Sequence, residues 1–432
     1  MSTSQDRYYL GAVATPLDTD ENKGRLVQRL RQYLEVRNLT VLIGNGSSIP
    51  LGAPLVGNAS AIGPELDEDP YRLRKPEEHQ RAKALLQHLL ATKPSIGVEP
   101  LLTALVNVQG NDVLLGVAQT IGGATVTAAD ALLLERLMKK WLYHRCQKLS
   151  SIPNERLRDQ EELFRRLLLR STTLPRAKVF TTNYDLVIER ALDNLGVMYF
   201  DGFLGTINRT LRTESYHYDL YYPGETTEGR VSRVDRVIHL YKLHGSTNWR
   251  RRSTSNDVII TQVQPDESEY GDVMIYPSPL KVTEMNGYPY AEMFRHFSAT
   301  IHQPQSALLT IGYKFQDDHI NRLIYQALSI PSFTLIIVIP SISEPPDTHK
   351  LEPQHEVWRL INRVSSNRIL VVTGGNSDPV TGQYVSGAGT LHDFSTVWLP
   401  DIRELNVEAN AREETRKALR PLRAAVGEDD EH

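Results

Sequence analysis

Three polar side chains follow short apolar segments that end in a turn. Asn183 and Asp185 come just after 177–181 (AKVFT), and His244 follows 236–243 (RVIHLYKL). A histidine can act as a general base near neutral pH, and an amide both donates and accepts hydrogen bonds. Asp185 is also placed simply to cap a helix expected over 185–195, and a single histidine is more often structural. The catalytic candidates are therefore Asn183, His244 and Asp185, with Thr182 and Tyr184 as ligand-binding neighbours.

Two further apolar segments end in glycine turns. One leads into Gly44-Asn45-Gly46-Ser47-Ser48, and 306–311 leads into Gly312 and Tyr313. Glycine lets the backbone approach a pyrophosphate closely, and amide N–H groups and serine hydroxyls can bind its oxygens. The first turn is not a Walker A loop, because no Gly-Lys-Ser/Thr follows, and such a turn is equally often a plain connection. The pattern thus predicts cofactor-binding residues at Gly44, Asn45, Gly46, Ser47, Ser48, Gly312 and Tyr313.

The elements that carry these turns have the pattern of a parallel sheet. The apolar segments are nearly continuous, which is typical of strands covered on both faces. Helical patterns lie between some of them, and polar groups at the carboxyl ends of parallel strands face a ligand crevice. The sequence predicts a doubly wound, mainly parallel Rossmann-like α/β sheet whose first strand lies near residue 41. The further strands are expected at 177–181, 236–243, 306–311, 333–339, 368–373 and 395–399, with helices at 317–329 and 353–366.

The 432 residues divide into a core, an insertion and a tail. Residues 1–60 and 175–400 are expected to form the nucleotide-binding core. Residues 61–174 are mostly helical in pattern and are expected to form an inserted subdomain. Residues 401–432 carry dense alternating charge and end in acidic residues, as in an exposed helix followed by an acidic tail.

Composition excludes several classes of protein. With 48 Lys and Arg against 52 Asp and Glu, the chain lacks the basic excess of a protein that holds DNA mainly by charge, so no direct nucleic-acid binding is expected. The single cysteine, Cys146, permits neither an intrachain disulfide nor a four-cysteine zinc site, and it fits a cytoplasmic location. No signal peptide is evident at the N-terminus. The uncharged stretch from Val113 to Ala129 is too short and polar for a membrane span.

Taken in order, the motifs resemble the sirtuin family. The specific elements are Thr182-Asn183-Tyr184-Asp185 and His244-Gly245, accompanied by the turns at Gly44 and Gly312. The resemblance implies a sirtuin core that takes NAD as its substrate. It also implies that Asn183 positions water or the nicotinamide ribose, that Asp185 orients the turn, that His244 is the general base, and that the turn with Ser48 holds the pyrophosphate or ribose.

The chain differs from the deacylating sirtuins in several residues, and these differences indicate which group of sirtuin-like proteins it resembles. Those enzymes carry a zinc module with paired Cys-x-x-Cys, which a chain with one cysteine cannot build. Leu55, Val56 and Gly57 stand where the deacylase pattern has Asp-Phe-Arg, and Asn45 replaces the usual Ala. The chain therefore resembles the zinc-free, sirtuin-like NAD hydrolases of bacterial antiphage defence. This implies an NAD glycohydrolase that depletes NAD (abortive infection), a homo-oligomer, and a HerA-type hexameric ATPase as partner. The alternatives are an NAD-dependent protein deacylase or ADP-ribosyltransferase, and a non-enzymatic NAD or ADP-ribose sensor.

Overall fold

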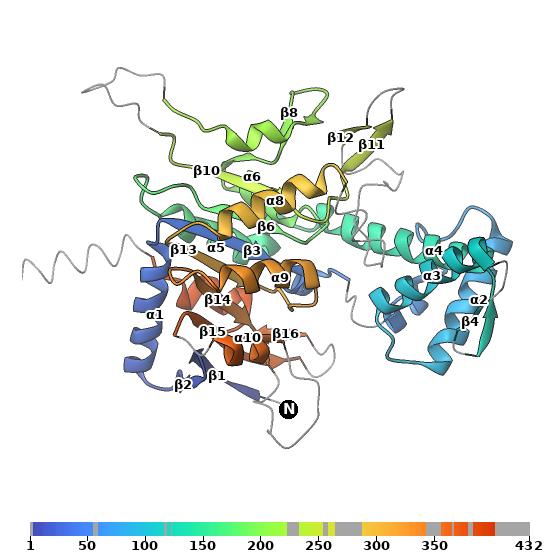
Figure 1. The fold of residues 1–432 in the computed structure, drawn as a ribbon, viewed down its shortest axis with the longest axis horizontal. Coiled ribbons are helices and arrows are strands. Elements are labelled where there is room, and N and C mark those ends of the chain that lie inside the picture. Colours follow the sequence, from blue (N-terminus) through green and yellow to red (C-terminus); the bar gives the residue numbers. More distant parts are fainter. Residues whose placement is uncertain are drawn as a thin grey trace, which may run out of the picture.

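A ten-stranded sheet forms the centre of the molecule (Figure 1). The computed structural model describes residues 3–54, 59–115, 119–121, 123–222, 233–253, 258–263, 287–342, 356–364, 367–378 and 383–401. The strand order is β2-β1-β15-β14-β13-β3-β6-β10-β7, with β16 paired to β15. The parallel strands are β3 (Asn38–Ile43), β6 (Lys178–Thr181), β7 (Met198–Phe200), β10 (Val237–Lys242), β13 (Ser306–Ile311), β14 (Thr334–Ile339) and β15 (Ile369–Ser377).

The chain winds outward from β3 in both directions. It builds β6, β10 and β7 on one side, and later builds β13, β14 and β15 on the other. This change of direction confirms the predicted doubly wound, mainly parallel fold, and it places the switch point between β3 and β13. At the far edge β1 (Thr3–Leu10), β2 (Val13–Pro16) and β16 (Tyr384–Ser386) add antiparallel strands. The sequence analysis missed this N-terminal hairpin, because its charged and polar residues interrupt any apolar pattern.

Helices cover both faces of the sheet, which explains the nearly continuous apolar strands. Alternate side chains point to opposite faces: Val41 and Val179 enter one core, whereas Leu42 and Phe180 enter the other. The first face is covered by α1 (Asp20–Leu34), α5 (Arg158–Leu168) and α6 (Val187–Asn194). The second face is covered by α8 (Tyr290–Ile301), α9 (Asp318–Ala327) and α10 (Glu356–Val364).

The expected strand at 395–399 is wrong. The segment forms a π-helical turn, η9 (Phe394–Trp398), directly after the short helix α11 (Leu391–Asp393). The hydroxyl of Thr390 accepts a hydrogen bond from the amide of Asp393 and so starts a helical turn. Phe394 and Trp398 then pack into the core beside α1 and α5. A short apolar segment does not by itself distinguish a buried strand from a buried helical turn.

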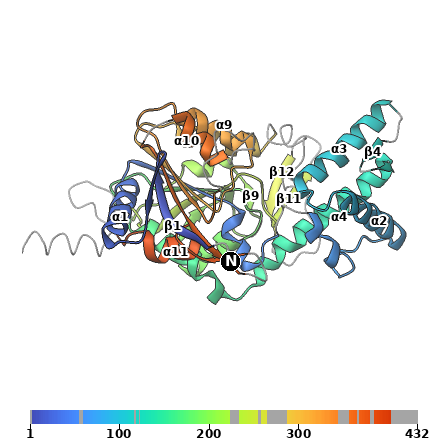
Figure 2. The same ribbon diagram turned by 90° about the horizontal axis from the view of Figure 1, so that it is seen from below.

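A helical lobe projects from one side of the sheet (Figures 1 and 2). It has a core of its own, in which Leu86, Leu105, Leu137 and Trp141 are almost completely buried. The lobe consists of α2 (Pro76–Thr92), α3 (Val98–Leu115), α4 (Ala128–Gln147) and the hairpin β4 (Gln119–Ile121)–β5 (Ala124–Val126).

The segment 61–174, expected to form one inserted subdomain, is divided between two cores. Helix α5 lies within this range, yet Leu163, Phe164 and Leu167 pack into the core of the sheet rather than into the lobe. The amphipathic pattern of α5 shows that one face is buried but does not show against which core.

A second, small antiparallel sheet lies beside the main one and has the order β11 (Trp249–Ser253), β12 (Val258–Gln262), β9 (Thr210–Leu211), β8 (Phe203–Leu204).

Two expectations fall partly outside the described residues. Residues 402–432, the expected charged helix and acidic tail, lie beyond them, as do Leu55, Val56 and Gly57. Among the helices that the structure describes, none combines the length and the apolar character required to cross a bilayer.

The reactivity of Cys146 tests whether the core of the lobe is packed as the structure shows. Its side chain lies in the lobe core, and burial raises the pKa of its thiol. Because the thiolate is the reactive species, we expect a thiol reagent to label the native protein roughly 100-fold more slowly than the protein in denaturant. A Cys146→Ser/Ala91→Cys variant is the matched control, because Ala91 is exposed and its replacement should react quickly in both states. Equal rates for native and unfolded wild-type protein would contradict the packing.

Candidate functional site

The carboxyl ends of four adjacent parallel strands meet at one edge of the sheet. The strands β13, β3, β6 and β10 are neighbours in this order. Backbone hydrogen bonds continue the pairing past the strand ends: the amide of Gly44 donates to Ile311 (2.9 Å), and that of Leu243 donates to Thr181 (2.8 Å). The structure therefore brings to one edge the residues that the sequence placed in separate turns: Gly44–Ser48, Thr182–Asp185, His244, Gly312 and Tyr313.

The two glycine turns press directly against each other. A Cβ atom added to Gly44 or Gly46 would lie 2.6 or 2.7 Å from the carbonyl oxygen of Gly312, which is too close for any side chain. Gly312 itself adopts φ +64°, in the left-handed region that favours glycine. Contact between two backbones therefore accounts for all three glycines. The sequence analysis offered a different reason, namely close approach to a pyrophosphate.

Several amides of the first turn are already used within the protein. The amide of Gly46 donates to Gly312 (2.9 Å), that of Ser47 to Gly44 (3.1 Å), and that of Ser48 to Asn45 (2.9 Å). Asn45 is half-buried, and its side-chain amide donates to Pro54 (2.9 Å). In this conformation a phosphate would have to contact the turn mainly through its more accessible residues, Asn45 and Gly46.

Asn183 is buried and held by two serines. Its Nδ2 donates to the hydroxyl oxygens of Ser48 (3.1 Å) and Ser47 (3.4 Å), and its amide donates to the hydroxyl of Thr181 (3.0 Å). Its Oδ1 is buried and accepts no hydrogen bond from the residues that the structure describes. An unsatisfied buried acceptor costs about 1–3 kcal/mol, so this oxygen is suited to receive a hydrogen bond from a ligand. Ser48 is completely buried, so it orients Asn183 instead of facing a ligand as expected.

His244 pairs with a carboxylate that was not among the predicted site residues. Its Nε2 lies 3.0 Å from Oδ2 of Asp317, and both side chains are buried. The other carboxylate oxygen of Asp317 caps α9 by accepting from the amides of His319 (3.0 Å) and Ile320 (3.4 Å). A fixed carboxylate beside an imidazole orients the ring and stabilises its protonated form. The signal for Asp317 was present in the sequence as an acidic residue between a strand-end turn and a helix.

Tyr313 orders the loop that delivers Asp317. Its hydroxyl donates to Oδ1 of Asn321 (2.9 Å), and Nδ2 of Asn321 donates to the carbonyl of Phe315 (2.8 Å). Phe315 adopts φ +56°, an uncommon conformation for a residue with a side chain. Strain of this kind persists only where the surroundings enforce it. Tyr313 was predicted to bind the cofactor, whereas its buried side chain here fixes the loop.

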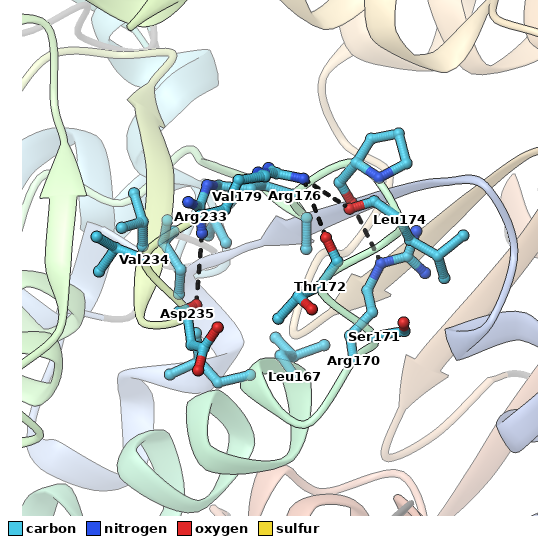
Figure 3. Close-up of a pocket in the computed structure, with 15 residues that line it drawn as sticks. Leu167, Arg170, Ser171, Thr172, Leu174, Arg176, Val179, Arg233, Val234 and Asp235 are labelled. Carbon is cyan, nitrogen blue, oxygen red and sulfur yellow. Dashed lines mark hydrogen bonds between the residues drawn. The ribbon is translucent and has the colours of Figure 1, made fainter. Parts of the chain in front are cut away.

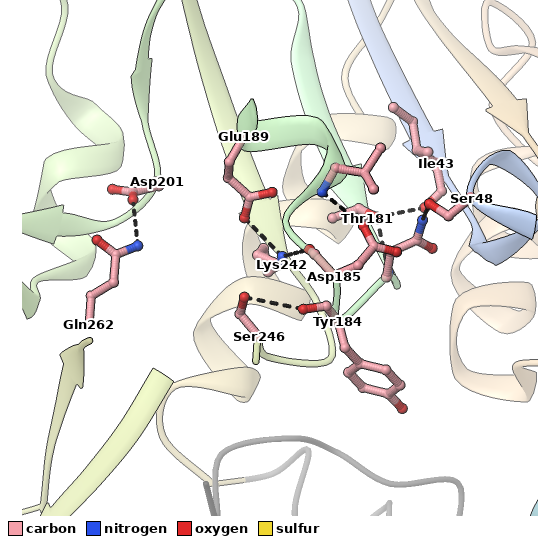
Figure 4. A network of polar contacts seen from close by, with 12 residues as sticks. Ile43, Ser48, Thr181, Tyr184, Asp185, Glu189, Asp201, Lys242, Ser246 and Gln262 are labelled. Carbon is pink, nitrogen blue, oxygen red and sulfur yellow. Dashed lines mark hydrogen bonds and ion pairs between the residues drawn. The ribbon is translucent and has the colours of Figure 1, made fainter. Parts of the chain in front are cut away.

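A buried ion pair lies next to the turn that carries Asn183 (Figure 4). Nζ of Lys242 lies 2.8 Å from Oε1 of Glu189 on α6 and donates to the main-chain oxygen of Asp185. Oδ1 of Asp185 accepts from the amide of Val187 (3.1 Å), the first residue of α6; Leu186 occupies the N-cap position, so Asp185 fixes the turn without being the N-cap that the sequence suggested. Burial raises the pKa of Asp185 and of Glu189, although the charge of Lys242 opposes the shift. Lys242 and Glu189 were not predicted, although a lysine within an apolar strand was a visible signal.

The inserted segment contacts both turns. Tyr184 packs against the core of the helical lobe, and its ring centroid lies 6.2 Å from that of His244. From α5, Nε2 of Gln160 donates to the carbonyl of Ser47 (3.0 Å). Arg145, at the end of α4, donates to the carbonyl of Gly52 (3.1 Å). The lobe and α5 thus help to position the edge where Asn183 and His244 meet.

The chemistry available at this edge is that of an amide and an imidazole–carboxylate pair. Among the described residues, no group of three or more His, Cys, Asp or Glu side chains is placed to hold a metal ion. Two cavities lie at the opposite, amino-terminal edge of the sheet. Figure 3 shows the one lined by Leu167 and Val179, and the other is lined by Lys178 and Tyr218. His239, which lies within β10, belongs to that edge, where its Nε2 lies 2.9 Å from the carbonyl of Tyr218.

The fold and the site together describe a doubly wound α/β protein with polar side chains gathered at the switch-point edge. Residues 177–360 match the model of the SIR2-like domain, a range that contains Asn183, His244 and Asp317. No curated protein matches the chain. Similar solved structures include a Sir2 homologue mutant with 2′-O-acetyl ADP ribose (14% identity, 78% of this chain and 96% of that chain, TM-score 0.33). Another is a Sir2 homologue mutant with ADP ribose (16% identity, the same coverage, TM-score 0.31).

The buried ion pair predicts a strong and partly reversible loss of stability. Lys242→Met leaves Glu189 buried without its partner, so the free energy of unfolding should fall by about 3–5 kcal/mol. Adding Glu189→Leu should recover part of this loss, because no uncompensated charge then remains. Urea unfolding measures both variants, with Lys23→Met in the exposed pair with Asp20 as a control that changes little. A double variant no more stable than Lys242→Met would show that the two charges are not coupled.

Proposed function

We propose that this protein hydrolyses NAD at the nicotinamide–ribose bond, giving ADP-ribose and nicotinamide. One observation carries the proposal: within the matched SIR2-like domain, Asn183, whose Oδ1 has no partner among the described residues, and His244, with its carboxylate, lie at the same strand edge. They are two of the residues for which the resemblance implies a catalytic role. NAD is the substrate, and the reaction as proposed requires no zinc.

The proposed reaction breaks the bond between C1′ of the ribose and the nicotinamide nitrogen, which takes the electron pair. Water forms the new bond to C1′ and loses a proton. His244 would take this proton directly or through a ribose hydroxyl, a contribution of roughly 10²–10⁴-fold. Oδ1 of Asn183 would accept a hydrogen bond from the water or from a ribose hydroxyl and so fix its position. Asp317 would stabilise the imidazolium that forms.

The remaining site residues would hold the substrate or the catalytic groups. Asn45 and Gly46 are the more accessible part of the first turn and would lie against the pyrophosphate. Ser47 and Ser48 orient Asn183, and Asp185 fixes the turn between β6 and α6. Thr182 and Tyr184 flank Asn183 and would line the ribose side of the site.

An enzyme that drains NAD would kill its host if it were always active, so we infer that its activity is restrained. The resemblance supports a role as a cytoplasmic antiphage effector that forms a homo-oligomer and acts with a HerA-type hexameric ATPase. The helical lobe offers a route for such restraint, because it contacts Tyr184 and, through Arg145, the carbonyl of Gly52 shortly after the first turn. Mixing the chain with the ATPase and measuring mass and NAD loss tests this partnership. Unchanged mass and unchanged activity would argue against it.

The catalytic assignment predicts that His244→Ala and Asn183→Ala each lower NAD turnover at least ~10²-fold while leaving the fold intact. The assay follows nicotinamide and ADP-ribose by mass spectrometry, with and without an acyl-lysine peptide and the ATPase. His88→Ala, an exposed position in the lobe, is the matched control and should keep full activity. Undiminished turnover in both site variants refutes the assignment.

The same assay separates the alternatives. NAD loss that depends on the peptide would indicate a deacylase, and transfer to an acceptor protein would indicate an ADP-ribosyltransferase. Tight binding of NAD or ADP-ribose with no product would indicate a sensor.

The pair of His244 and Asp317 predicts a change in pH dependence. In Asp317→Asn the imidazolium loses its neighbouring negative charge, so the acidic limb of the kcat profile should move to lower pH. The kcat should fall roughly 10–1000-fold with KM little changed, because the imidazole is less well oriented. Asp318→Asn, the exposed neighbour, is the control. A purely structural role for Asp317 would lower stability without moving the pH profile.

A further inference from the structure

A cavity of about 820 Å³ opens at the amino-terminal edge of the sheet, away from Asn183 and His244. We call it the amino-edge cavity. Its walls come from the start of β6 and β10 and from the segments that precede β3, β6 and β10. Its lining includes Arg176, Lys178, Tyr218, Tyr221, Arg233 and His239.

The amino-edge cavity has an excess of positive charge. Four of its wall residues are arginine or lysine, and two, Glu35 and Asp219, are acidic. Oδ1 of Asp219 accepts from Nε of Arg176 (2.6 Å), and Oδ2 accepts from Nη2 of Arg233 (2.9 Å), so one carboxylate serves two guanidinium groups. Glu35 is paired with Arg31, outside the cavity (3.3 Å).

Lys178 lacks a counter-ion within the part of the chain that the structure describes. Its Nζ donates to the hydroxyl of Thr300 at 3.4 Å, and no described carboxylate lies within ion-pair distance. Burial lowers the pKa of this lysine, as expected for a cation partly removed from water. An anion placed in the cavity would stabilise an ammonium group in this position.

Further hydrogen-bonding atoms around the cavity are unsatisfied. Nη2 of Arg176, Nε of Arg233 and Nδ1 of His239 are buried and have no hydrogen-bond partner among the described residues. Figure 3 shows Arg176 and Arg233 side by side, where they also donate to backbone carbonyls such as that of Leu174 (3.1 Å). These atoms are covered, so their side chains would have to rotate before a ligand could contact them. Guanidinium groups match the geometry of phosphate oxygens closely.

Two exposed tyrosine rings complete the amino-edge cavity. Tyr218 and Tyr221 are 47% and 51% exposed, although both are large and largely apolar. Exposed aromatic rings beside cationic groups suit a ligand that combines a phosphate with a planar base. The volume lies within the range of small-molecule sites, roughly 300–1,000 Å³.

We propose that the amino-edge cavity binds a nucleotide, with its phosphate near Arg176, Lys178 and Arg233 and its base against Tyr218 and Tyr221. This site is separate from the catalytic edge. Lys178 begins β6, whose opposite end leads to Asn183, and His239 precedes the end of β10 that leads to His244. The proposal goes beyond NAD hydrolysis and does not depend on it.

The test measures binding of AMP, adenosine and inorganic phosphate to the full chain by calorimetry. We expect AMP to bind at least roughly tenfold more tightly than either fragment. Lys178→Gln and Arg233→Gln should each weaken AMP roughly tenfold or more. Tyr221→Ala should weaken AMP without affecting phosphate. Asn183→Ala should leave AMP binding unchanged, and Arg236→Gln, an exposed arginine that does not line the cavity, is the matched control.

Three outcomes overturn the proposal. The first is no saturable AMP binding up to about 10 mM, a concentration above that of any useful site. The second is binding lost in Asn183→Ala but kept in Lys178→Gln, which would place AMP at the catalytic edge. The third is phosphate binding as tight as AMP with no effect of Tyr221→Ala, which would rule out the nucleotide. If Arg233→Gln fails to fold by circular dichroism, Lys178→Gln decides, because its one described hydrogen bond is the long one to Thr300.

Discussion

The arrangement of the site depends on the contact between two backbones at the switch point of the sheet. Gly44 and Gly46 lie against Gly312 so closely that no side chain fits at any of the three positions. This contact fixes the turn after β3 against the turn after β13. The turn after β3 positions Asn183 through Ser47 and Ser48, and the loop after β13 positions His244 through Asp317. This contact therefore links the groups that orient Asn183 to the group that orients His244, while the pairing of β6 with β10 brings these two residues, 61 positions apart in the sequence, to the same edge.

The buried ion pair of Lys242 and Glu189 also stabilises this edge of the sheet. Lys242 connects β10 to α6 through Glu189 and to the turn through the main-chain oxygen of Asp185. Such pairs cost free energy to bury, and removing one partner costs more. In this protein the ion pair holds the turn in place, and Oδ1 of Asn183 on that turn has no partner among the described residues. A preorganised polar group of this kind needs little rearrangement when a substrate binds.

The helical lobe is tied to the site, although it has a separate core. Tyr184 joins the lobe core to the turn that carries Asn183. Gln160 of α5 donates to Ser47 in the first turn, and Arg145 of α4 donates to Gly52, shortly after that turn. A change in the packing of the lobe therefore has a direct path to both turns. This arrangement gives a physical basis for control of activity by assembly.

The sequence by itself determined the parallel strands β3, β6, β10, β13, β14 and β15, several of the helices that cover them and the turns that carry polar residues, because periodicity and glycine placement are local signals. It placed Asn183 and His244 at strand ends, and the parallel order of β3, β6, β10 and β13 then brought them together. Only the tertiary structure decided which partners these residues have. Asp317 lies 73 residues from His244, and Gln160 lies 113 residues from Ser47, so no local pattern reports either contact. The same reason explains why 395–399 is helical and why α5 joins the main core: local apolarity shows that a segment is buried, but not which surface buries it.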